Sequence, residues 1–253
     1  MSAAARSGPG RVLVVRNDAT DPVGLLGQWL EAAGLELVDV RADAGDPVPS
    51  SVPDDIDAVI SLGGAMSATS DAEATWLPAE RSLLRDAVER EVPVLGVCLG
   101  GQLLTVALGG VVRAAVVPEY GLVQLDLTAA AADDPLFDKI APGSPVAQYH
   151  SDEMAELPAQ AVLLASTPAC PHQAWRFGQN AWAVQFHPEI DAATLADWAG
   201  TDAATLAREG TTPAEVTGTL AAREREVAAV WEPFATAFAA VVRAAAHARL
   251  SQL

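Results

Sequence analysis

Short apolar runs alternate with helical stretches through the first half of the chain. Four such runs are bounded by turn residues and are typical of buried strands: residues 11–15, 35–40, 56–62 and 92–97. Between them the sequence predicts two helices. One begins at a cap formed by Asp21-Pro22 and ends at Gly34, and the other covers residues 76–89 with apolar side chains at helical spacing. This alternation favours parallel βαβ units, with the sheet covered on both faces.

The pattern changes after residue 110, where six strand-like segments follow one another through short connections. These are residues 111–117, 121–128, 146–150, 161–165, 173–177 and 181–186, and the last two are predicted to pair as a hairpin around residues 178–180. From residue 191 the chain is helical, and its final segment carries one apolar stripe. We therefore expect a mixed, largely parallel central sheet flanked by helices.

This organisation predicts three parts. Residues 1–10 are expected to be a disordered tail, residues 11–190 one α/β domain, and residues 191–253 a C-terminal helical extension packed on that domain. The chain of 253 residues, 51% of them hydrophobic, is long enough for such a core.

Charge and cysteine content restrict the class of protein. The formal net charge of −18 argues against binding to nucleic acid, whose phosphates an acidic surface repels. Two cysteines are too few for a disulfide-stapled secreted scaffold. The first ten residues lack the apolar core of a signal peptide, and Glu232, Pro233 and Arg243 interrupt the last apolar stretch, so we expect no membrane span. The expected location is the cytoplasm.

The segment Gly96-Val97-Cys98-Leu99-Gly100 places a cysteine between a predicted strand and the predicted helix 101–109. Small residues two positions before and after the cysteine permit strained backbone angles and close approach of a substrate. A helix N-terminus favours the thiolate, which is the reactive form. A single cysteine is most often a core residue, but the G-x-C-x-G pattern favours a nucleophile elbow.

A thiolate that transfers acyl groups needs a base, and His187 is the strongest candidate. It ends the predicted strand 181–186, and Glu189 follows two residues later on the same side of an extended chain. Alone, this pair would equally fit a strand-end histidine beside a solvated glutamate. Beside the cysteine elbow, we predict that Cys98, His187 and Glu189 form a nucleophile–base–carboxylate triad.

The remaining candidates are weaker. Gly63-Gly64 follows the third strand, at the sheet edge where α/β proteins bind ligands, and can present backbone N–H groups to an oxyanion. His150 ends a strand and can line a pocket, whereas His172 and His247 are predicted to be structural or on the surface. No spacing among the histidines and cysteines is typical of a metal site.

Taken together, Gly96 to Gln102, His187-Pro188-Glu189 and Gly63-Gly64 resemble the class I (triad) glutamine amidotransferases. The sequence is most similar to stand-alone members related to the amidotransferase domain of GMP synthase, over residues 11–190. The resemblance implies a flavodoxin-like fold without a cofactor or metal.

The resemblance also implies roles for individual residues. Cys98 would attack the side-chain amide of glutamine and carry a γ-glutamyl thioester, His187 would move the proton, and Glu189 would orient His187. The amides of Gly64 and Leu99 would form the oxyanion hole. The residues implied in substrate binding are Met66, Gln102, Tyr149, His150, Ser151 and Asp152.

Two departures from the family pattern leave the acceptor of ammonia open. Ala65 stands where the family usually has proline after the two glycines, and neither a synthetase domain nor a phosphate-binding G-x-x-x-x-G-K segment is present. The chain either supplies ammonia to a separate synthetase partner or hydrolyses a γ-glutamyl amide or peptide by itself. The C-terminal helices would pack on the domain, form a homodimer or dock the synthetase.

Two other classes remain as alternatives. An esterase-type cysteine hydrolase would normally place its acid before its histidine, whereas here Glu189 follows His187. A catalytically silent regulatory module would need no triad.

Overall fold

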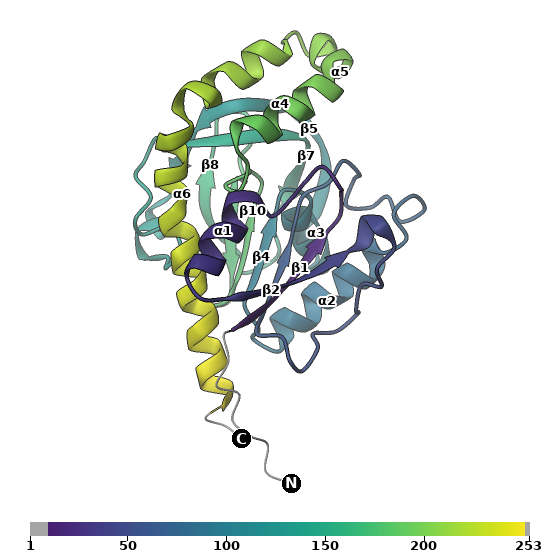
Figure 1. Cartoon of the computed structure of the whole chain (residues 1–253), viewed down its shortest axis with the longest axis vertical. Coiled ribbons are helices and arrows are strands. Elements are labelled where there is room, and N and C mark those ends of the chain that lie inside the picture. The colour runs from purple at the N-terminus through teal and green to yellow at the C-terminus, as the bar shows by residue number, and fades with distance from the viewer. Residues whose placement is uncertain (1–9, 251–253) are drawn as a thin grey trace.

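The structure is a computed structural model that describes residues 10–250, so the tail expected at residues 1–10 lies outside the described residues except for Gly10. Its centre is an eight-stranded sheet with the order β2-β1-β3-β4-β10-β9-β8-β6. Figure 1 labels β2, β1, β4, β10 and β8 of this sheet. The strands are β1 (Arg11–Arg16), β2 (Glu36–Arg41), β3 (Ala58–Ser61), β4 (Val94–Val97), β6 (Asp126–Leu127), β8 (Val162–Ser166), β9 (Ala174–Phe177) and β10 (Ala181–Val184).

The five strands from β2 to β10 pair in parallel, and β10-β9-β8-β6 pair antiparallel. This confirms the predicted mixed, largely parallel sheet and the β9–β10 hairpin. Parallel pairing brings the carboxyl ends of β1, β3, β4 and β10 to one sheet edge. The last residues of β4 and β10, Val97 and Val184, are paired in the sheet. Cys98 directly follows β4, and His187 lies three residues after β10.

Two apolar cores lie on opposite faces of the sheet. Alternate residues of β1 point to each face, with Val12 and Val14 in one core and Leu13 and Val15 in the other. The first core lies under α1 (Gly24–Ala32) and α6 (Pro213–Leu250), and the second under α2 (Leu77–Glu89) and α3 (Leu99–Ala107). Short 3-10 helices, η1 (Ala42–Ala44) and η2 (Ala129–Asp133), complete the connections.

Two local predictions differ from the structure. The segments expected as strands 111–117 and 121–128 form mostly one strand, β5 (Val111–Gln124), which pairs antiparallel with β7 (Pro145–Glu156) in a separate two-stranded sheet. A register shift between Ala114 and Glu119 produces the break visible in the sequence. Asp21 does not cap α1, which begins at Gly24 without a side-chain cap, because the Asp21 side chain is buried at the sheet edge instead.

The C-terminal segment forms α4 (Ala192–Thr201), α5 (Ala203–Arg208) and the long helix α6, which runs along the side of the molecule (Figure 1). The predicted stripe on α6 is buried against the domain, with Val227, Trp231, Phe234 and Phe238 in the first core. By length and composition alone, Pro213–Ala248 is also apolar enough to cross a membrane, a test that core helices of soluble proteins pass as well.

Candidate functional site

Cys98 lies on the tight turn between β4 and α3, with φ 49° and ψ −109°. A positive φ is strained for a residue with a side chain, so the backbone here has the form expected of an elbow. The neighbouring glycines are required by close packing. A Cβ on Gly96 would lie 2.5 Å from the carbonyl oxygen of Gly100, and one on Gly100 would lie 2.0 Å from that of Ser61.

His187 and Glu189 are paired in the loop after β10. Nδ1 of His187 lies 2.6 Å from Oε1 of Glu189, and both side chains are buried. Nε2 of His187 makes no hydrogen bond within the described residues, which leaves this atom for a thiol or a substrate. Burial would lower the pKa of His187, but the charges of Glu189 and Cys98 outweigh it and raise that pKa well above its usual value.

The N-terminus of α1 fixes the backbone of Glu189. The amide of Leu25 donates to the carbonyl oxygen of Glu189 at 2.8 Å. Gly24 has φ +50°, and a Cβ there would lie 2.3 Å from the same oxygen. Only glycine therefore fits at this position without displacing Glu189.

Most of the predicted site residues line one cavity of about 680 Å³. Its walls include Gly64, Met66, Cys98, Gln102, Tyr149, His150, Ser151, Asp152 and His187. Leu99 and Glu189 are not part of the cavity wall, but both adjoin it: a Cβ on Gly64 would lie 3.0 Å from Cδ2 of Leu99, and Glu189 pairs with His187. The structure thus brings the whole predicted set to one end of the sheet.

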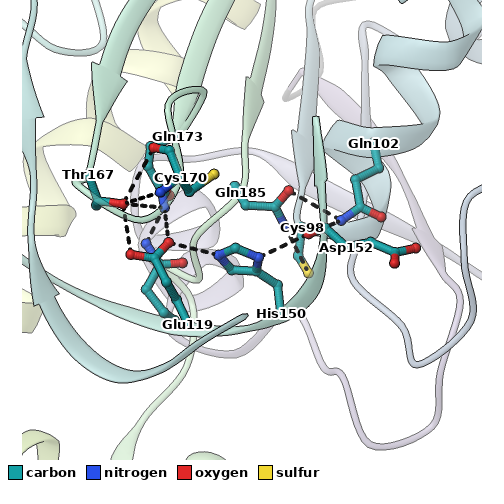
Figure 2. Close-up of polar contacts among 10 residues, drawn as sticks. Cys98, Gln102, Glu119, His150, Asp152, Thr167, Cys170, Gln173 and Gln185 are labelled. Atoms are coloured by element: carbon teal, nitrogen blue, oxygen red, sulfur yellow. Dashed lines mark hydrogen bonds and ion pairs between the residues drawn. The ribbon is translucent and has the colours of Figure 1, made fainter. Parts of the chain in front are cut away.

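Gln102 and Gln185 form a short polar chain beside the cysteine (Figure 2). Nε2 of Gln102 donates to the carbonyl oxygen of Asp152 and to Oε1 of Gln185, both at 3.2 Å. Nε2 of Gln185 lies 3.7 Å from the sulfur of Cys98. The sequence analysis did not single out Gln185, because one glutamine within the predicted apolar strand 181–186 carries no motif.

His150 is buried and lines the cavity, and Figure 2 shows its ring between Asp152 and Glu119. Its Nδ1 lies 2.9 Å from the carbonyl oxygen of Asp152, and its Nε2 lies 3.1 Å from Oε2 of Glu119. Glu119 also accepts from Thr167 Oγ1 at 2.7 Å and from Gln173 Nε2 at 2.6 Å. These contacts hold His150 and, through it, Ser151 and Asp152, which continue β7 beyond the strand end predicted at residue 150.

Two groups of side chains lie close enough together to hold a cation, namely Glu119 with His150 and Cys170, and Asp21 with His187 and Glu189. In the first group both oxygens of Glu119 already accept hydrogen bonds, and burial raises the pKa of Cys170 to about 12. That thiol is therefore protonated near neutral pH, unlike a metal-binding thiolate.

Trp198 of α4 completes the wall around the histidine. Its ring centroid lies 4.8 Å from that of His187, and its Nε1 donates to the carbonyl oxygen of Thr20 at 2.8 Å. The hydroxyl of Tyr149 lies 3.3 Å from the carbonyl oxygen of Trp198. The sequence indicated only that the C-terminal helices pack on the domain, and not that they contact the site.

Comparison with known proteins gives the same family as the motifs. Residues 25–196 match the family model described as glutamine amidotransferase class-I. The glutamine amidotransferase-like protein YfeJ of Salmonella typhimurium is 31% identical over 183 residues, which cover 71% of this chain and 76% of that protein. One subunit of the glutamine-hydrolyzing GMP synthase from Saccharolobus solfataricus is 40% identical over 103 residues, covering 40% of this chain and 53% of that protein.

Solved structures agree in fold. A glutamine amidotransferase from Thermotoga maritima superposes with a TM-score of 0.80 at 22% identity, covering 91% of this chain and 98% of the other. One from Methylobacillus flagellatus gives a TM-score of 0.78 at 24% identity, covering 94% of each chain. Because the family model matches most of its length, the chain belongs to the class-I glutamine amidotransferases.

Proposed function

We propose that the protein hydrolyses the side-chain amide of glutamine through a γ-glutamyl thioester on Cys98. The observation that carries the proposal is the buried pair of His187 and Glu189, 2.6 Å apart, on the same cavity as a cysteine with φ 49°. Membership of the family supports glutamine amide hydrolysis in general. The roles of individual residues are those that the resemblance implies, and the shared cavity supports them.

The first half-reaction forms the thioester. The thiolate of Cys98 attacks the amide carbon, and the amides of Gly64 and Leu99 are proposed to stabilise the oxyanion. Protonated His187 then gives its Nε2 proton to the nitrogen as the C–N bond breaks, and ammonia leaves. Glu189 stabilises the protonated ring and holds its orientation.

The second half-reaction returns the free enzyme. Neutral His187 takes a proton from water, which attacks the thioester carbon, and the C–S bond breaks to release glutamate. Met66, Gln102, Tyr149, His150, Ser151 and Asp152 line the cavity or lie at its edge, and we propose that they hold the substrate.

The identity of the nucleophile can be tested by release of glutamate and ammonia and by labelling with the glutamine analogue 6-diazo-5-oxo-L-norleucine. We expect Cys98→Ala to lose both turnover and labelling. Cys170→Ala is the matched control, because Cys170 is the other cysteine, is buried and does not line the cavity. Glutamine hydrolysis that persists in a folded Cys98→Ala variant would overturn the proposal.

A second candidate function is donation of ammonia to a separate synthetase. It is favoured by the likeness to the GMP synthase protein of Saccharolobus solfataricus, which matches 40% of this chain. This function predicts that a synthetase co-purifies with the protein and raises its glutaminase rate. A high rate without a partner would favour a free hydrolase, and silence both alone and with co-purified partners would favour a regulatory module.

A further inference from the structure

The charged residues that line the cavity are acidic. Five aspartates line it, and no lysine or arginine of residues 10–250 does: Asp18, Asp21, Asp152, Asp197 and Asp202. Its volume of about 680 Å³ lies within the ~300–1,000 Å³ of pockets for drug-sized ligands, which are much larger than glutamine. Both features point to a substrate with a bulkier and positively charged part.

Asp21 supplies independent evidence for an unfilled ligand position in this cavity. Its side chain is 4% exposed and lines the cavity, yet its Oδ1 has no hydrogen-bond partner within the described residues. A buried polar atom without a hydrogen-bond partner is costly unless a ligand completes it. Burial raises the pKa of Asp21 to about 7, while the charge of His187 acts in the opposite direction.

The position of Asp21 indicates which part of the substrate it faces. Carboxylate and ring atoms of Asp21, His187 and Glu189 lie within 4.8 Å of one another. His187 must reach the nitrogen of the leaving group to protonate it, so groups around His187 lie on the leaving-group side. Trp198 contacts the His187 ring and also lines the cavity, where an aromatic ring can attract a cation.

The C-terminal helices contribute two further carboxylates to this side. Asp197 precedes Trp198 in α4, and Asp202 follows the helix; both are exposed at the cavity. Asp202 accepts from the hydroxyl of Tyr149 at 3.3 Å, which fixes it at the rim. A cleft lined by one sign of charge concentrates ligands of the opposite sign.

We propose that the same site hydrolyses mono-γ-glutamyl amides of diamines, whose free end is an ammonium group that Asp21, Asp197 and Asp202 attract. This inference rests on the proposed thioester chemistry of Cys98. The thiolate attacks the γ-carbonyl carbon, His187 protonates the amide nitrogen, and the C–N bond breaks to release the diamine. Water then hydrolyses the thioester to glutamate. Substrates whose leaving amine carries a carboxylate are disfavoured by repulsion.

Three probes with the same four-carbon leaving group isolate its charge: γ-glutamyl-putrescine, γ-glutamyl-butylamide and γ-glutamyl-4-aminobutyrate. We expect kcat/KM for the cationic probe to exceed that for the neutral probe by about tenfold or more at low salt, and the anionic probe to be the poorest. Added salt should reduce the difference, because it screens exposed charges.

Substitutions test whether the carboxylates of Asp197 and Asp202 cause the preference for the cationic probe. In the double variant Asp197→Asn with Asp202→Asn, we expect the cationic-to-neutral ratio to fall several-fold. The double variant Asp133→Asn with Asp138→Asn also removes two charges, at exposed positions away from the cavity lining, and should leave the ratio unchanged. A ratio near or below one in the wild type, or a ratio that the double variant leaves intact, would overturn the inference while glutamine turnover still supported the proposed function. Absence of turnover with glutamine and all three probes would overturn both.

Discussion

The ring of Trp198 lies edge-on against the ring of His187, with centroids 4.8 Å apart. The same indole donates a hydrogen bond to the carbonyl oxygen of Thr20 at 2.8 Å, in the loop after β1. One side chain of α4 therefore connects the proposed catalytic base with a loop 178 residues earlier in the chain. The C-terminal helices form part of the cavity wall as well as packing on the sheet.

Replacing Trp198 should weaken catalysis through the position of His187. An aromatic pair contributes about 0.5–1.5 kcal/mol, so we expect Trp198→Ala to lower kcat/KM for glutamine by about two- to tenfold. Trp198→Phe retains a ring but loses the hydrogen bond to Thr20, and we expect a smaller loss. Steady-state kinetics on both variants tests this, and wild-type kinetics in Trp198→Ala would show that the contact has no role in catalysis.

Gly24 and Gly34 offer a matched pair of substitutions. Both have positive φ, but a Cβ on Gly24 would meet the carbonyl oxygen of Glu189, whereas one on Gly34 would have no atom within 4 Å. Each alanine variant should lose roughly 1–2 kcal/mol of stability from backbone strain. We expect Gly24→Ala alone to lose most glutamine hydrolysis as well, because it displaces Glu189. Equal activities of the two folded variants would contradict this reasoning.

Glu189→Gln keeps the size of the side chain but removes the charge that raises the pKa of His187. General acid–base catalysis typically contributes about 10²–10⁴-fold, and we expect a loss of kcat in that range.

The same substitution tests an effect on stability. Because the pKa of His187 is higher in the folded protein than in the unfolded chain, protonation of His187 stabilises the fold at pH values below the unfolded-state pKa. This stabilisation is lost as the pH rises through the folded-state pKa. Thermal unfolding of the variant should therefore show a weaker loss of stability at alkaline pH than the wild type.

Glu80 provides a pH effect on stability apart from the triad. It is buried, accepts from Ser61 Oγ at 2.6 Å and from Asn17 Nδ2 at 3.3 Å, and burial raises its pKa to about 7. The folded protein then binds this proton more tightly than the unfolded chain, so ionisation of Glu80 lowers the free energy of unfolding as the pH rises from about 4.5 to about 7.

Glu80→Gln removes this titration. We expect the Tm of the variant, relative to wild type, to rise between about pH 5 and about pH 8, because only the wild type must bury an ionised carboxylate at the higher pH. Differential scanning calorimetry at the two pH values measures the effect. A Tm difference that does not change with pH would show that Glu80 is already ionised in the fold at the lower pH.

The sequence predicted the fold where side-chain patterns are strong. Strands such as β3 and β4 are buried on both faces and appear as continuous apolar runs, and the glycines around Cys98 mark the elbow directly. Residues 118–120 were predicted to be a turn between two strands, but they lie within β5, next to the register shift between Ala114 and Glu119.

Other features depend on contacts between distant segments, which a single sequence does not reveal. Asp21-Pro22 has the composition of a helix cap, yet Asp21 is buried beside His187. Trp198 lies in an amphipathic helix and has no motif, and Gln185 is one polar residue directly after the apolar strand β10. Each reaches the site only through tertiary packing.

The central claim is that Cys98 carries the γ-glutamyl group. The most direct measurement is mass spectrometry of the wild-type protein quenched in acid during turnover of glutamine, followed by peptide mapping. We expect one γ-glutamyl group on the peptide that contains Cys98, sensitive to hydroxylamine and missing from Cys98→Ala. Glutamine turnover with no adduct on that peptide, together with undiminished ammonia release by Cys98→Ala, would contradict the claim.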